Sequence, residues 1–193
     1  MRNTSGVKAK MNYIKIINAL KNKGIIFEKG LSKQEFNMIE NFYGVNFPPD
    51  LKEFLSLALP ISNKFINWRD MSEDNIKKIQ DKLEWPLEGI IFDIENNNFW
   101  YKNWGNKPDN FEEAIDICKK EMKKVPKLIP ICSHRYIPSE PNESGNPIFS
   151  IYQTDIIYYG EDLLSYLQLE FNMKKYEDID FDLIKEIKFW VDL

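Results

Sequence analysis

Cysteine and histidine are scarce in this chain of 193 residues, and their scarcity excludes several kinds of site. Cys118, Cys132 and His134 are its sole thiol and imidazole groups, whereas a structural zinc site needs about four suitably spaced ligands. We therefore predict no metal site and no cofactor. Two cysteines are also too few to staple a secreted domain, so we expect reduced thiols and a cytoplasmic location.

Glycine-rich loops and long apolar runs are missing as well. The eight glycines are scattered, so no phosphate-binding loop is predicted. No segment approaches the roughly 20 apolar residues that span a bilayer, and residues 1–11 are polar and basic, unlike a secretory signal. No serine lies in the Gly-flanked elbow typical of a Ser–His–acid triad. We predict no catalytic residues, no enzymatic activity and no contact with a membrane.

Charge is small in total but unevenly spread. The net charge is −4, yet residues 1–29 hold seven basic residues and one acidic residue, and residues 160–193 hold nine acidic and four basic residues. An acidic body lacks the clustered lysine and arginine of a nucleic-acid footprint, so no direct nucleic-acid binding is expected. The acidity suits a basic protein partner, or it only keeps the protein in solution.

The residues that are present predict a globular α+β fold. Ser32 and Glu35 form a capping box that begins a helix ended by Gly44, and Pro49 begins the next helix. Periodicity and turn signals predict further helices over 13–23, 72–83, 111–124, 163–171 and 181–191. They predict strands over 90–94, 99–102, 128–132, 147–152 and 156–159, a leader without regular structure over 1–10 and a loop over 135–145.

These elements predict a single domain. We expect one largely antiparallel or mixed sheet, partly covered by helices, with the helix from Asp50 packed on it. Residues 1–29 are interpreted as a basic leader and an N-terminal helix, residues 30–171 as the α+β domain, and residues 172–193 as an acidic helical extension packed on that domain.

Two stretches are candidate binding surfaces. Residues 99–108 contain Trp100 and Trp104, which could anchor a partner or could plug the sheet edge and shape a loop. Residues 134–138 could form a recognition loop that presents His134 and Arg135, or these two side chains could bond to nearby loop carbonyls.

Several segments in order resemble the SUKH superfamily, the group related to a fungal cell-wall-synthesis regulator. The resemblance covers residues 30–171, so that part is interpreted as a SUKH-like domain. It rests on segments 30–35, 43–45, 47–55, 67–69, 104–108, 134–136 and 145–160, together with Asp162-Leu163 and Tyr166-Leu167.

The resemblance implies a function. Many bacterial members are regarded as immunity proteins, which bind and neutralise a toxin, and fungal members act as regulatory scaffolds. The family has no accepted catalytic residues. We therefore expect a non-catalytic module that binds a protein, namely an immunity protein whose partner is a toxin domain. A regulatory or scaffold domain and a small-molecule-binding protein are the alternatives. The predicted partner-binding residues are Trp68, Arg69, Trp100, Trp104, His134, Arg135, Tyr136 and Tyr158.

Overall fold

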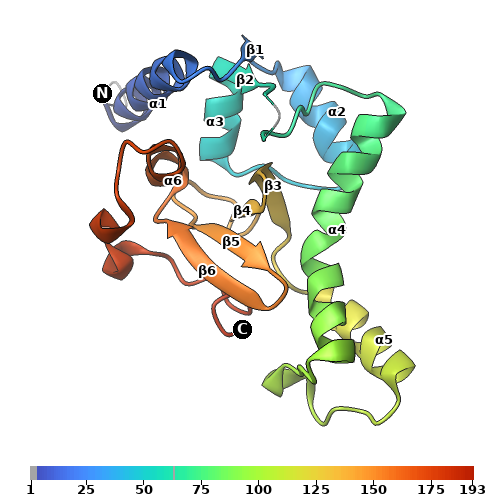
Figure 1. Cartoon of the computed structure of the whole chain (residues 1–193). Coiled ribbons are helices and arrows are strands. Elements are labelled where there is room, and N and C mark those ends of the chain that lie inside the picture. The colour runs from blue at the N-terminus through green and yellow to red at the C-terminus, as the bar shows by residue number, and fades with distance from the viewer. Residues whose placement is uncertain (1–3, 63) are drawn as a thin grey trace.

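A computed structural model describes residues 4–62 and 64–193 and confirms the α+β class (Figure 1). The helices in this part of the chain are α1 (Thr4–Asn22), α2 (Lys33–Tyr43), α3 (Pro49–Leu57), α4 (Glu73–Asn96), α5 (Phe111–Met122) and α6 (Leu163–Glu170). The strands are β1 (Phe27–Lys29), β2 (Ala58–Pro60), β3 (Leu128–Cys132), β4 (Arg135–Pro138), β5 (Ile148–Tyr152) and β6 (Asp155–Gly160). Short 3-10 turns cover Lys102–Trp104, Tyr176–Asp178 and Phe181–Leu183.

The strands form two antiparallel sheets, so the prediction of one sheet is wrong. The larger sheet has the order β3-β4-β5-β6, and β1 pairs with β2 in a separate ribbon. Successive strands of the larger sheet are neighbours, which is the order that short connections favour. Phe65 pairs with Cys132, and the Ile66 amide donates to the Ile131 carbonyl, so a short segment lies against the outer edge of β3.

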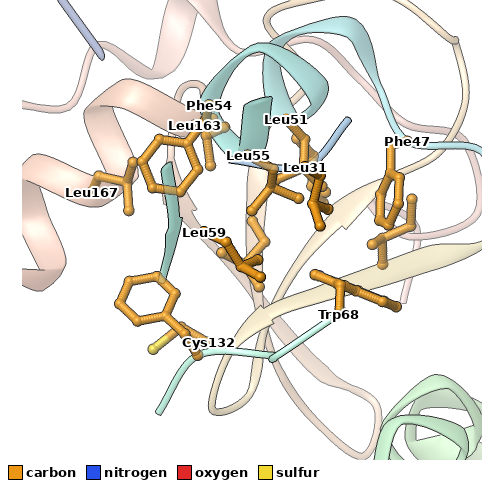
Figure 2. Close-up of a cluster of buried hydrophobic side chains, with 14 of the residues drawn as sticks. Leu31, Phe47, Leu51, Phe54, Leu55, Leu59, Trp68, Cys132, Leu163 and Leu167 are labelled. Carbon is orange, nitrogen blue, oxygen red and sulfur yellow. The ribbon is translucent and has the colours of Figure 1, made fainter. Parts of the chain in front are cut away.

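Side chains from the two faces of the larger sheet enter two different core clusters. Helices α1, α2, α3 and α6 pack on one face, in a cluster that includes Leu51, Phe54 and Leu167 (Figure 2). Figure 2 shows Leu51, Phe54 and Leu55 of α3 among these side chains. The cluster also contains Ile129, Ile131 and Ile148 of the sheet, so the helix from Asp50 packs on the sheet as expected. Helices α4 and α5 and the C-terminal segment supply the cluster on the other face, with Tyr136 and Phe149 from the sheet.

Local signals set several boundaries as predicted. The Ser32 hydroxyl accepts from the Glu35 amide while the Glu35 carboxylate accepts from the Ser32 amide, which completes the capping box of α2. Gly44 ends α2 in the left-handed conformation, and Pro49 lies in the first turn of α3. The hairpin of β5 and β6 and helix α6 also lie where the sequence predicts them.

Five predicted elements are wrong. Residues 90–94 belong to α4, where Ile90 and Ile94 are buried one turn apart. Residues 99–102 pair with no strand. Helix α1 includes residues 4–10, while residues 1–3 of the expected leader lie outside the described part. Residues 135–138 form β4 rather than a loop, and residues 181–191 begin with one 3-10 turn instead of a helix.

The C-terminal segment is held by buried rings rather than by a helix. Ile187, Phe189 and Trp190 are buried in the second core cluster, and the Trp190 indole donates to the Pro126 carbonyl at 2.8 Å. The Tyr101 hydroxyl donates to Asp192 at 3.0 Å. In the part of the chain that the structure covers, no helix is both long and apolar enough to cross a membrane.

Candidate protein-binding surface

Two of the predicted partner-binding residues have no surface to offer a partner. Trp68 is 2% exposed and its ring packs edge-on against Phe47 at 4.9 Å, inside the first core cluster. Tyr136 is fully buried in the second cluster, and its hydroxyl donates to the Lys82 carbonyl at 2.9 Å. Trp68 and Tyr136 were predicted to contact a partner, but both are core residues. Large rings are the side chains that gain most from burial.

The bond from Tyr136 compensates for a proline inside α4. Pro86 has no amide hydrogen, so the Lys82 carbonyl, four residues earlier, lacks its helical donor. The Tyr136 hydroxyl donates to this carbonyl from the sheet. Burial raises the pKa of Tyr136, which keeps the hydroxyl protonated as a donor. A proline at this position usually ends or kinks a helix. Here α4 continues, and the sheet supplies the donor that the proline lacks.

Arg69 and Arg135 are occupied by contacts within the chain. The Arg69 guanidinium binds the carboxylates of Glu35 at 2.6 Å and Glu28 at 2.9 Å. Arg135 donates to the Ser150 hydroxyl at 2.7 Å, and its guanidinium carbon lies 3.7 Å from the centre of the Tyr159 ring. These side chains stabilise the fold through charge-assisted and cation–π contacts, so neither presents a free guanidinium group.

The two tryptophans of residues 99–108 are half-buried and shape their own loop. The Trp100 indole donates to the Gly105 carbonyl at 2.8 Å, and the Trp104 ring stacks on Phe189 at 6.0 Å. Trp104 therefore also holds the C-terminal segment. Of the two interpretations left open for these residues, the one in which the tryptophans shape a loop fits these contacts.

His134 and Tyr158 are the remaining predicted residues. His134 is exposed in the turn between β3 and β4, with its Nδ1 atom 3.1 Å from the Ser133 hydroxyl. Partial burial and the positive charges of Arg135 and Lys82 lower the pKa of His134, so the ring is neutral near pH 7. Tyr158 is half-buried on β6 and its ring stacks on Phe149 at 5.3 Å.

Three exposed rings that the sequence reasoning did not select gather at one end of the larger sheet. Trp85 is 40% exposed, Phe92 is 45% exposed and Tyr152 is 63% exposed. Together with Glu88, Gly89 and Gln153 they line a hollow of about 180 Å³. We call Trp85, Phe92 and Tyr152 the ring patch. The sequence holds a sign of this patch, because Trp85 and Phe92 are two turns apart on one helix and so share a face. The prediction of a strand over 90–94 hid that spacing.

The ring patch is held on rigid elements. Gly89 lets α4 approach the hairpin closely: a Cβ atom there would lie 2.8 Å from the Gln153 Cα. The buried Asp93 carboxylate accepts bonds from the Thr154 amide at 2.9 Å and from its hydroxyl at 2.6 Å. Burial opposes ionisation of Asp93, but the bonds from Thr154 and Asn97 outweigh it and lower its pKa. Helix and hairpin are thus joined beside the rings.

The side chains of the ring patch are suited to contact with another protein. Tryptophan and tyrosine present large apolar faces together with a hydrogen-bond donor, a combination enriched in protein interfaces. The charged groups beside the rings are Glu88, Asp155 and Lys82, whose ammonium lies 5.5 Å from the Trp85 ring centre. In the described residues, no group of three or more His, Cys, Asp or Glu side chains is placed to hold a metal ion.

Comparisons with known proteins add no relative: no protein-family model matches the sequence, and searches of curated proteins and of solved structures find no match.

Proposed function

We propose that this chain is a non-catalytic protein-binding module that works in the cytoplasm as an immunity protein, capping a bacterial toxin through the ring patch. The resemblance to the SUKH superfamily supports the immunity role. The observation that carries the binding role is the gathering of Trp85, Phe92 and Tyr152 around one hollow. A few buried aromatic anchors supply most of the binding energy in typical interfaces.

Rigidity supports the same proposal. Backbone elements that are already fixed lose little conformational entropy when a partner covers them, which leaves more of the burial energy for affinity. The close approach at Gly89 and the bonds between Asp93 and Thr154 fix both elements that bear the rings.

Charge favours a basic partner. The chain has a net charge of −4, and Glu88 lines the hollow of the ring patch. Asp155 is exposed next to the hairpin turn and pairs with Tyr152 in the ladder. Opposite charge on a toxin surface would speed encounter, so association should slow as salt screens the exposed charges over about 10 Å at 0.1 M.

The test is co-expression with each toxin encoded beside the gene, followed by affinity measurement with the toxin that the wild type neutralises. We expect the wild type to restore growth and to bind with a 1:1 stoichiometry. Trp85→Ala and Tyr152→Ala should each weaken binding by about 2 kcal/mol, roughly 30-fold. Phe111→Ala is the matched control, because Phe111 is 54% exposed and lies on α5, outside the hollow.

The outcomes separate the two parts of the proposal. Equal losses for Trp85→Ala and Phe111→Ala would place the interface elsewhere. A second outcome is that the chain neutralises no neighbouring toxin but captures a different endogenous protein, and that the Trp85→Ala variant loses this capture. The binding role would then stand, and a regulatory scaffold would replace the immunity role.

A further inference from the structure

A larger hollow lies on the other side of α4, away from the ring patch. It has a volume of about 410 Å³ and is bounded by the end of α2, by α4, by α5 and by the start of β3. We call it the α4–α5 groove. Half-buried side chains from α4 and α5 form its walls: Leu83, Leu87 and Met122. Buried side chains form its floor: Val45, Pro86, Leu128 and Trp190.

The floor is fixed from two sides. Trp190 comes from the C-terminal segment and is held by the bond from its indole to the Pro126 carbonyl at 2.8 Å. Pro86 belongs to the part of α4 whose freed Lys82 carbonyl is bound by Tyr136. The apolar walls above this floor are half-buried, so part of their surface is in contact with water. Covering such walls with an apolar body is favourable.

The rim of the groove is mainly basic. Lys119, Lys123 and Lys127 line it, against one carboxylate, Glu84. The Lys127 ammonium is already bound by the Gly44 carbonyl at 2.7 Å. Within residues 4–62 and 64–193, the ammonium groups of Lys119 and Lys123 form no ion pair or hydrogen bond. Lys119 lies in the last turn of α5, and Lys123, four residues later, caps its end. Side chains at this spacing point to the same side of a helix.

We propose that the α4–α5 groove binds a small amphiphilic anion, with an apolar body along Leu83, Leu87 and Met122 and a carboxylate at Lys119 and Lys123. The size fits, since ligand pockets commonly enclose roughly 300–1,000 Å³. The chemistry fits too, because an apolar wall recognises the body and two uncommitted ammonium groups recognise a single anionic head. This site is separate from the ring patch and does not depend on the proposed function.

Calorimetric titration of the full chain with decanoate, below its micellar concentration, tests this. The informative variant is the double charge reversal Lys119→Glu with Lys123→Glu. Its matched control is Lys77→Glu with Lys120→Glu, which changes the net charge by the same amount at exposed lysines that do not line the groove. Leu87→Trp fills the groove without changing its charge, and circular dichroism shows whether that variant folds.

The wild type should bind one decanoate per chain. The reversal at Lys119 and Lys123 should weaken binding at least about tenfold, while the control should stay within about twofold. Decanol should bind about tenfold more weakly than decanoate, and Trp85→Ala should bind decanoate like the wild type. Lack of saturable binding, equal losses in both double variants, or decanol binding as tightly as decanoate would each overturn the proposal. If Leu87→Trp does not fold, the two charge-reversed variants still decide it.

Discussion

The guanidinium group of Arg69 joins three parts of the chain. Its Nε atom donates to Glu35 in α2, its Nη1 atom to Glu28 in β1, and its Nη2 atom to the Lys29 carbonyl at 2.9 Å. Glu35 also accepts from the Ser32 amide as part of the capping box. Hydrogen bonds from Arg69 and then from Ser32 lower the pKa of Glu35 to about 2. A residue predicted to contact a partner therefore orders the start of α2 instead.

The first prediction concerns stability in acid. Because the folded pKa of Glu35 lies below its ordinary value of 4.5, its contribution is complete above about pH 4.5 and is lost as pH falls toward about 2. Glu35→Gln can keep the cap hydrogen bond but removes the charge. We expect it to cost about 1 kcal/mol or less at pH 7, as for other partly exposed pairs, and to lose less stability than the wild type between pH 4.5 and pH 2.

Urea unfolding measured at several pH values checks this expectation. Far-UV circular dichroism at pH 7 controls for an intact α2. Parallel acid profiles for the two proteins would contradict the assigned role of Glu35.

Helix α4 shows how one element can satisfy two sequence patterns. The apolar run from Gly89 to Ile94 matches a buried strand as well as a helix, and Pro86 in front of it argues for a break. In the structure the helix continues through Pro86 to Asn96. Its buried residues face the sheet, and Trp85 and Phe92 remain exposed on the side that faces the hairpin turn.

The second prediction tests the close approach of α4 to the hairpin. Alanine is favoured over glycine by about 1 kcal/mol inside a helix, so Gly89→Ala would stabilise α4 in isolation. Here the new Cβ atom would lie 2.8 Å from the backbone of Gln153, which forces helix and hairpin apart. We expect a net loss of about 1–3 kcal/mol in the free energy of unfolding, as for other overpacked sites.

The neighbouring substitution Glu88→Ala is the control for helix propensity, and it should stay within about 0.5 kcal/mol of the wild type. Urea unfolding of both variants gives the comparison. A stabilised Gly89→Ala protein would show that the hairpin does not press on α4.

At the scale of the whole molecule, the larger sheet is covered on both faces. Successive residues of β5 enter different clusters: Ile148 lies in the cluster with α3 and α6, and Phe149 in the cluster with α4 and α5. A single hydroxyl also couples sheet and helix, since Tyr136 donates to the carbonyl that Pro86 leaves without a donor. The path of α4 therefore depends on the sheet behind it.

The third prediction measures this coupling. Tyr136→Phe keeps the ring but leaves the Lys82 carbonyl without a partner, which should cost about 1–3 kcal/mol. Pro86→Ala restores an amide hydrogen that can donate to the same carbonyl. In the Pro86→Ala protein, Tyr136→Phe should therefore cost less, with a coupling energy of at least about 0.5 kcal/mol.

A double-mutant cycle with urea unfolding provides the number. Each single variant serves as the reference for the double variant. Strictly additive losses would mean that Tyr136 and Pro86 act independently, and that the hydroxyl does not replace the helical donor.

Signals that act over a few residues were sufficient to predict part of this protein. The capping box at Ser32, the left-handed Gly44, Pro49 in a first turn and the last hairpin depend on short-range hydrogen bonds and permitted backbone angles. The α+β class follows from the order of such elements. None of this requires knowing which distant segment packs on which.

Tertiary structure alone decided the rest. An apolar run such as residues 90–94 buries similar area as a strand or as a helix, so its conformation depends on the surface that receives it. The same holds for the candidate site. Trp68 and Tyr136 are buried in the core. Trp85, Phe92 and Tyr152 are exposed, because the helix and the hairpin that carry them pack with other faces toward the core. Exposure is a property of the packed molecule: a sequence shows which rings exist, and only the arrangement of sheet and helices determines which of them a partner can touch.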